Sequence, residues 1–257
     1  MADQRIIVLI SANSEWRAVK EILTPALVKS SPFGEMFDVQ KITYFHAGWG
    51  KISAAATTQY VIDQFHPLLL VNLGTCGGFE GRIERGTVIL VTKTIVYDIL
   101  EKMSDPDDAI AHYSTELDLS WIKNRELLPT TLGHSAIVYS PLISADRDIV
   151  PEDIPNLVQK YGAVAADWES GPIAWVAKRN GVRCLILRGV TDLVSTEGGE
   201  AYGNIDLFHQ NTKSIMRTLI DGLPTWLEES TKGSHLPPIG LLHGKRLIPL
   251  TRVGRCG

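Results

Sequence analysis

The chain has 257 residues, of which 44% are hydrophobic and 21% are charged, and its formal net charge at pH 7 is −4. This length and apolar content predict a single α/β domain with a large core. The slightly acidic balance argues against a nucleic-acid partner, because binding to phosphate backbones needs a concentrated basic face, so we expect a small-molecule ligand.

In chain order, the first half of the sequence alternates between predicted strands and helices. An apolar run at 6–10 predicts a buried strand, and Ser14 is suited to cap the following helix, with Glu15 in its first turn. Further strands are predicted at 39–46, 68–73 and 87–92, the last extending through 95–97, and a second helix at 53–65. Glycine-rich turns are predicted at 48–51 and 74–78.

The second half continues this alternation after an irregular insertion. Residues 100–131 lack a clear period and predict loop with a short helix. Strands are predicted at 135–143 and 182–187, and helices at 152–161, between Pro172 and Gly181, and at 207–220. We expect one domain over residues 1–227, followed by a disordered or artificially added tail at 228–257.

Cysteine spacing and the lengths of the apolar runs indicate a cytoplasmic protein. Cys76, Cys184 and Cys256 are widely separated and have no disulfide or metal-ligand spacing, so we expect reduced thiols. The histidines show no ligand spacing either, and we expect neither a metal nor a cofactor. No run approaches the ~18 apolar residues of a membrane span, and the run at 6–10 is too short for a signal peptide, so we expect no membrane partner.

Three carboxylates are the main candidates for chemistry, because ligands bind at the carboxyl ends of strands in open α/β sheets. Partial desolvation would raise the pKa of Asp192 and let it donate a proton near neutral pH; the alternative is a helix cap or a pair with Arg188. A helix dipole would keep Glu169 ionised and suited to bind vicinal sugar hydroxyls, or Glu169 has only a helix-start role. Glu15 would be the third carboxylate of the site, beside Asp192 and Glu169. The alternative is a structural role only, because Glu is common in first helical turns.

The glycine-rich segment 74–78 is suited to contact an oxygen-rich ligand through backbone N–H groups and the hydroxyl of Thr75. It lacks both the Walker pattern and the dinucleotide fingerprint, so it does not predict a nucleotide-phosphate site, and a purely structural role stays open. Cys76 is better explained as a small packed residue than as a nucleophile.

Four ordered motifs carry a family resemblance over roughly residues 5–222: GWGKISAA at 48–55, VNLGTCGG at 71–78, ADWES at 166–170 and RGVTD at 188–192. In this order and spacing they resemble the nucleoside phosphorylase and nucleosidase superfamily, in particular its methylthioadenosine/S-adenosylhomocysteine nucleosidase branch. The resemblance implies a single three-layer α/β domain with a central mixed sheet, part of it closing into a barrel. It also implies cleavage of the N-glycosidic bond of a purine nucleoside and a homodimer or higher homo-oligomer.

By position, the resemblance also implies roles for individual residues. Asp192 corresponds to the acid that protonates the purine and Glu15 to the base that activates water. Glu169 corresponds to the residue that holds the ribose hydroxyls, and Arg188 and Thr75 to residues that orient the water. The other residues expected to bind substrate are Trp49, Gly77, Ile149, Trp168 and Thr191.

Three positions depart from the family pattern and bear on the substrate. Trp168 stands where the methylthioadenosine nucleosidases usually have Met, and Trp49 where a small aliphatic residue is usual, so two indoles reshape the expected pocket. Asp148 stands where a purine-stacking Phe is typical, which leaves the base contact to the backbone of Ile149 or to Trp168. Tyr97 or Tyr202 is expected to line the 5′ side.

Hydrolysis is the predicted reaction, and two alternatives stay open. The phosphorylases of this family bind phosphate with arginines in the first loop and before the glycine segment, whereas this chain has 11–15 (SANSE) and Asn72-Leu73 there. A carboxylate beside the phosphate would repel the substrate anion. The alternatives are a purine nucleoside phosphorylase, since Thr75 suits phosphate, and a nucleoside-binding protein without turnover.

Overall fold

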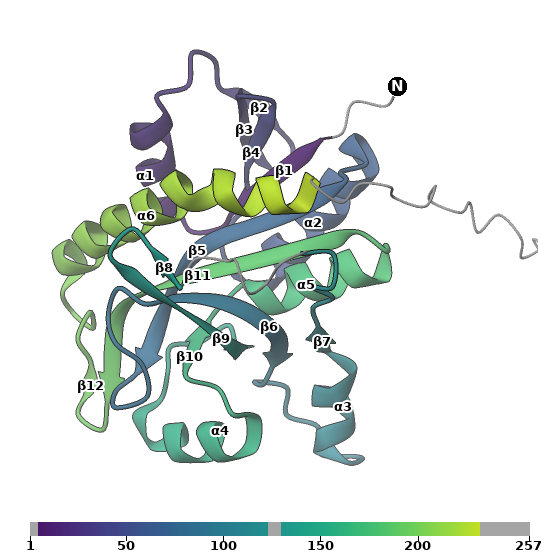
Figure 1. Cartoon of the computed structure of the whole chain (residues 1–257). Coiled ribbons are helices and arrows are strands. Elements are labelled where there is room, and N and C mark those ends of the chain that lie inside the picture. The colour runs from purple at the N-terminus through teal and green to yellow at the C-terminus, as the bar shows by residue number, and fades with distance from the viewer. Residues whose placement is uncertain (1–4, 123–129, 232–257) are drawn as a thin grey trace, which may run out of the picture.

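A mixed β-sheet runs through the centre of the protein (Figure 1). The computed structural model describes residues 5–122 and 130–231. Its strands are β1 (Ile6–Ile10), β2 (Lys29–Ser31), β3 (Gly34–Val39), β4 (Ile42–His46), β5 (Leu69–Phe79), β6 (Val88–Val96), β7 (Ser114–Glu116), β8 (Thr131–Leu132), β9 (Ser135–Ser144), β10 (Ala165–Asp167), β11 (Arg183–Ser195) and β12 (Gly198–Gly199).

Helices cover the sheet on both faces. They are α1 (Asn13–Leu23), α2 (Gly50–Phe65), α3 (Pro106–His112), α4 (Ile154–Tyr161), α5 (Ser170–Arg179) and α6 (Ile205–Thr231), and a 3-10 turn spans Pro151–Asp153. One apolar cluster joins the sheet to α1 and α6, and another joins its opposite side to α2 and α5. The result is a three-layer arrangement, in which α1 and α6 lie against each other (Figure 1).

Part of the sheet closes into a ring of strands. β5 pairs in parallel with β11, which pairs antiparallel with β6, and the ring returns from β6 through β9 and β10 to β5. β1, β4, β3 and β2 extend the sheet beyond β5. The predicted α/β domain with a mixed, partly barrel-like sheet is therefore confirmed.

The predicted strand at 39–46 is confirmed over 42–46, as β4, but residues 39–41 belong to the preceding strand and to a hairpin turn. β3 ends at Val39 and β4 begins at Ile42, and Gln40 and Lys41 between them have φ angles of 51° and 68°. Two consecutive residues of positive φ make a tight turn between antiparallel strands. The pair Gln40-Lys41 predicts such a turn less strongly than Asn-Gly would.

The predicted glycine turn at 74–78 is wrong, since β5 passes straight through it. Gly74, Gly77 and Gly78 do not have positive φ angles. They are small because neighbours crowd them: a Cβ on Gly77 would lie 2.9 Å from Ile149, and one on Gly78 would lie 2.8 Å from Val190. Glycine is therefore needed here for close packing inside the ring of strands. Composition alone does not distinguish a glycine-rich turn from a closely packed strand.

The remaining elements largely follow the prediction. The insertion contains the short helix α3, but also the unexpected strand β7, and residues 123–129 lie outside the described part of the chain. Helix α6 continues past residue 227 to Thr231, so the predicted tail begins inside a helix, and residues 232–257 lie outside the described part. None of the described helices is both long and apolar enough to span a membrane.

Candidate active site

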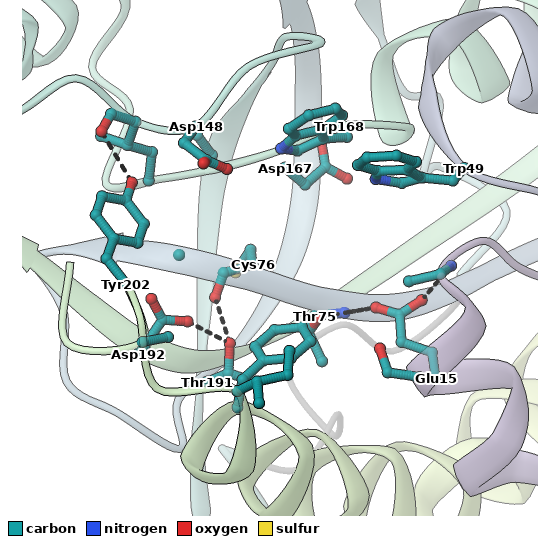
Figure 2. Close-up of a pocket in the computed structure, with 18 of the residues that line it drawn as sticks. Glu15, Trp49, Thr75, Cys76, Asp148, Asp167, Trp168, Thr191, Asp192 and Tyr202 are labelled. Carbon is teal, nitrogen blue, oxygen red and sulfur yellow. Dashed lines mark hydrogen bonds between the residues drawn. The ribbon is translucent and has the colours of Figure 1, made fainter.

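One cavity of about 590 Å³ gathers most of the residues that the sequence singled out. The predicted site residues that line it are Glu15, Trp49, Thr75, Gly77, Ile149, Trp168, Glu169, Thr191 and Asp192. Figure 2 shows Glu15 and Asp192 on opposite sides, with the indoles of Trp49 and Trp168 facing the same space. Arg188 is the exception, because it is 1% exposed and does not line the cavity.

Glu15 is held rigidly at the start of α1. Its Oε1 accepts hydrogen bonds from the Thr75 N–H at 2.6 Å and the Thr75 hydroxyl at 2.8 Å. Its Oε2 accepts the N–H of Ala12 at 3.1 Å, so Ala12 is the N-cap residue and the predicted cap at Ser14 is wrong. Glu15 thus caps its own helix while its carboxylate lies against β5.

Glu169 is a buried carboxylic acid just before α5. It is 7% exposed, and its Oε1 accepts the N–H of Gly50 at 3.1 Å. Burial raises the pKa of Glu169 to about 8, and the negative charges of Asp167 and Glu15 act in the same direction. The prediction that the helix dipole keeps this group ionised is therefore wrong, because desolvation and two nearby carboxylates outweigh the helix terminus.

This raised pKa makes a prediction for stability. The unfolded chain ionises Glu169 near its ordinary pKa of 4.5, whereas the folded chain keeps the proton up to about 8, so the stabilising effect is complete below 4.5 and lost as the pH rises through 8. Relative to the wild type, Glu169→Gln should gain stability by up to about 1.4 kcal/mol per pH unit inside this window. Urea unfolding at several pH values measures this gain.

The exposed Glu84 provides the matched control for that experiment. Its Gln variant should follow the wild type at every pH. A difference between Glu169→Gln and the wild type that stays constant from pH 5 to 8 would contradict the raised pKa of Glu169.

A β-bulge turns Asp192 toward the cavity. The strand predicted at 182–187 is longer than expected, because β11 continues to Ser195, and its register with β5 shifts between Val190 and Asp192. Val190 packs in the apolar cluster beneath α5, and after the bulge Leu193, rather than Asp192, packs against that cluster. The extra residue, Thr191, therefore sends the carboxylate to the opposite face, as bulges beside active sites commonly do.

The surroundings of Asp192 favour its protonated form. It is 7% exposed, and burial raises its pKa, assisted by the negative charges of Glu200 and Asp148. The Thr191 hydroxyl donates a 2.7 Å hydrogen bond to its Oδ1, which acts in the opposite direction. The expected desolvation is confirmed, and neither alternative explanation holds, since Asp192 lies in a strand and does not pair with Arg188.

Arg188 pairs instead with Asp167, a residue that sequence reasoning missed. Its Nε donates to Asp167 Oδ2 at 2.8 Å and its Nη2 to Asn72 Oδ1 at 2.6 Å. Asp167 also accepts the Ser170 N–H at 3.0 Å, so it caps α5 and leaves the carboxyl of Glu169 free to face the cavity. The only sequence signal was its place two residues before Glu169.

Two stacked indoles, those of Trp49 and Trp168, line the same cavity (Figure 2). The rings of Trp49 and Trp168 are 4.9 Å apart and 21° from parallel. Trp49 stays 64% exposed at the start of α2, where Gly48 and Gly50 have φ angles of 79° and 82°. These left-handed positions bend the chain so that the Gly50 N–H reaches Glu169.

Tyr202 lies at the opposite end of the cavity, beside Asp192. Its hydroxyl donates a 2.9 Å hydrogen bond to the carbonyl of Ile149 (Figure 2). Burial raises the pKa of Tyr202 to about 12, so it remains a donor. Tyr202 lines the cavity, whereas Tyr97 packs in an apolar cluster and does not. That one of these tyrosines lines the 5′ side stays a prediction.

The lining also contains residues that the sequence did not identify. They include Arg17 on α1, Asp167 on β10, Arg147 before Ile149, and Phe208 and His209 on α6. No local sequence pattern marks the two α6 residues as part of the site. The only general indication is that their helix begins near the edge of the sheet.

Comparison with known proteins identifies the family. The model of the phosphorylase superfamily matches residues 31–222. The chain belongs to this superfamily. A 5′-methylthioadenosine/S-adenosylhomocysteine nucleosidase of Maridesulfovibrio salexigens is 26% identical over 169 residues, which cover 63% of this chain and 72% of that protein. The nucleosidase of the same name from Marinomonas sp. is 20% identical over 72% of this chain and 83% of its own length.

Solved structures of other proteins share the fold. A mutant Helicobacter pylori methylthioadenosine nucleosidase with 5′-methylthioadenosine in its active site has a TM-score of 0.70 at 20% identity, covering 88% of this chain and 99% of its own. The futalosine hydrolase of Helicobacter pylori has a TM-score of 0.71 at 18% identity, covering 88% and 98%. At these identities the structures show the fold alone.

Proposed function

We propose that this protein is a nucleosidase that hydrolyses the N-glycosidic bond of a purine nucleoside such as 5′-methylthioadenosine. The observation that carries the proposal is that Glu15, Glu169 and Asp192 line one cavity from three separate parts of the chain. Membership of the phosphorylase superfamily and the nucleosidase names of the similar proteins support the same reaction.

The chemistry follows from the charges that develop as the bond breaks. The sugar becomes positive and the base becomes negative, so a proton donor is needed on one side and carboxylates on the other. Asp192 transfers its proton to the leaving purine as the bond from the base to C1′ breaks. Water forms the new bond to C1′ and gives its proton to Glu15, and solvent returns both side chains to their starting states.

Glu169 has the third role in this proposal. Its carboxyl accepts hydrogen bonds from the 2′ and 3′ hydroxyls, which stabilise the ionised form that burial disfavours in the free protein. Arg188 acts from behind the cavity: its ion pair with Asp167 keeps that carboxylate at the start of α5. Arg188 is therefore a positioning residue rather than a direct water ligand.

Water is favoured over phosphate because of the charges near Thr75. The carboxylate of Glu15 occupies both donors of Thr75, its N–H and its hydroxyl. Arg188 is paired with Asp167 and does not line the cavity. A phosphate placed here would face the carboxylate of Glu15, which is unfavourable at contact distance.

Measuring release of free base distinguishes the proposed reaction from its alternatives. The protein is incubated with 5′-methylthioadenosine, adenosine and inosine, each with and without inorganic phosphate. We expect adenine from 5′-methylthioadenosine without phosphate. Release only with phosphate would indicate a phosphorylase, and binding without release a nucleoside-binding protein; either result would overturn the proposal.

A further inference from the structure

Trp16 follows the proposed base in the chain and has no role in the proposed reaction. It is 4% exposed and does not line the cavity. Its ring lies 5.1 Å from that of Phe37 on β3 and stacks on that of His46, at the end of β4, at 5.4 Å and 7° from parallel. Glu15, one residue earlier, contacts β5 through Thr75 (Figure 2). The first turns of α1 therefore contact β5 on one side and β3 and β4 on the other.

The indole N–H of Trp16 is bonded to a carboxylate from outside the helix. It donates a 2.7 Å hydrogen bond to Oε2 of Glu35, and the ammonium group of Lys20 donates to the same oxygen at 2.8 Å. Lys20 lies one turn after Trp16, so the two donors are neighbours on one face of α1. The bonds from Lys20 and Trp16 lower the pKa of Glu35, which is therefore an anion at neutral pH. One carboxylate thus holds two successive turns of the helix.

The strand β3 presents Glu35 to the helix. Glu35 and Phe37 are two residues apart, and side chains alternate along a strand, so both face the side of the sheet that α1 covers. On β4, Tyr44 and His46 face the same side, and Tyr44 stacks on Phe37 with ring centroids 5.3 Å apart. The aromatic rings pack against the face of the indole, whereas Glu35 fixes its direction through a bond at the edge.

The two ends of α1 are held by different partners. Toward its C-terminal end, an ion pair joins α1 to α6. Toward its N-terminal end, Glu15 is bonded to Thr75 on one side and Trp16 to Glu35 on the other. Because Glu15 and Trp16 are consecutive residues of one helix, a rotation or tilt that shifts one of them shifts the other. The bond to Glu35 therefore limits the positions that the Glu15 carboxylate can take.

We propose that Trp16 and Glu35 are positioning residues that hold Glu15 where it can take the proton of the attacking water. This inference rests on the proposed function, because the role of Glu15 as base comes from it. A general base must lie within hydrogen-bond reach of the proton that it removes, and a displacement of about 1 Å can lower the rate up to about 10²-fold. In the proposed function Glu169 holds the sugar, so Trp16 and Glu35 should affect kcat rather than affinity.

Trp16→Phe tests the inference because it keeps an aromatic ring in the stack and removes the N–H donor. We expect single-turnover release of adenine from 5′-methylthioadenosine to fall about tenfold, with the calorimetric dissociation constant changed less than about twofold. Glu35→Ala should cause a loss of similar size, whereas Glu35→Gln should lose less, because its amide oxygen can still accept the indole N–H. The Glu35 side chain is 43% exposed, so its variants break the same bond without a change in the core.

A double variant separates positioning from stability. If Trp16 acts through Glu15, then Trp16→Phe should have no further effect on the rate once Glu15→Gln has removed the base. The matched control is Trp175→Phe on α5, outside the cavity lining, which also removes an indole N–H, here bonded to the carbonyl of His112 at 3.1 Å. This control should keep the wild-type rate, whatever its effect on stability.

A crystal structure of Trp16→Phe gives a readout that does not depend on turnover. We expect the Glu15 carboxylate to be displaced from the two donors of Thr75, and a carboxylate that keeps both hydrogen bonds would overturn the inference. A wild-type rate in Trp16→Phe or Glu35→Ala, an equal loss in the Glu15→Gln background, or an equal loss in Trp175→Phe would also overturn it. Failure of the proposed function gives a different result, because the wild type itself then releases no base. The displacement of Glu15 then still decides whether Trp16 positions it.

Discussion

Asp192→Asn should abolish most of the release of adenine while leaving nucleoside binding nearly intact. A positioned general acid contributes about 10²–10⁴-fold to the rate, and an amide of the same shape has no proton of comparable acidity. The loss should therefore appear in kcat, with the calorimetric dissociation constant for 5′-methylthioadenosine changed by only a few-fold. Release of adenine, followed at saturating nucleoside, measures the first quantity.

The pH dependence gives this prediction a second readout. Because burial raises the pKa of Asp192, the wild type should lose activity as the pH rises above that pKa and the acid loses its proton. The residual activity of Asp192→Asn should not show this loss as the pH rises. The control is Asp63→Asn on the exposed side of α2. Wild-type turnover in Asp192→Asn would remove this residue from the acid role.

Glu15→Gln should cause a loss of similar size for a different reason. The Gln side chain has nearly the same shape and can still accept the N–H of Thr75 through its carbonyl, but it cannot take a proton from water. Loss of a general base costs about 10²–10⁴-fold in rate. Single-turnover release of adenine isolates this step from product release.

Glu21→Gln is the control on the same helix, since Glu21 faces Lys213 outside the cavity. It should retain wild-type turnover of 5′-methylthioadenosine. If Glu15→Gln gains activity on addition of phosphate, removal of the carboxylate has relieved repulsion of the anion. If Glu15→Gln hydrolyses the nucleoside at the wild-type rate, Glu15 is not the base.

The order of strands and helices could be predicted well because it depends on local periodicity. The apolar runs at 6–10 and 182–187 are buried strands in the structure, within β1 and β11. Their carboxyl ends lead to Glu15 and Asp192, which the structure brings to one cavity. The spacing of the motifs helped to predict the site because it reflects the lengths of the strands and helices between them.

Features that depend on contacts between distant segments could not be predicted. Gly77 and Gly78 have the composition of a turn, but contacts with Ile149 and Val190 decide that they stay in a strand. Likewise, burial is the main cause of the raised pKa of Glu169, and Asp167 and Glu15 raise it further; neither the burial nor the proximity of Glu15 can be read from the sequence. In both cases tertiary packing overrides the local preference.

The bulge at Thr191 means that the direction of the acid depends on the backbone geometry of β11 as well as on the identity of the residue. Side chains along a regular strand alternate between its two faces, so the same residues without the bulge would direct Asp192, like Val190, into the apolar layer beneath α5. A relative with a regular β11 at this point would present the preceding residue to the cavity instead, even where alignment shows a matching carboxylate.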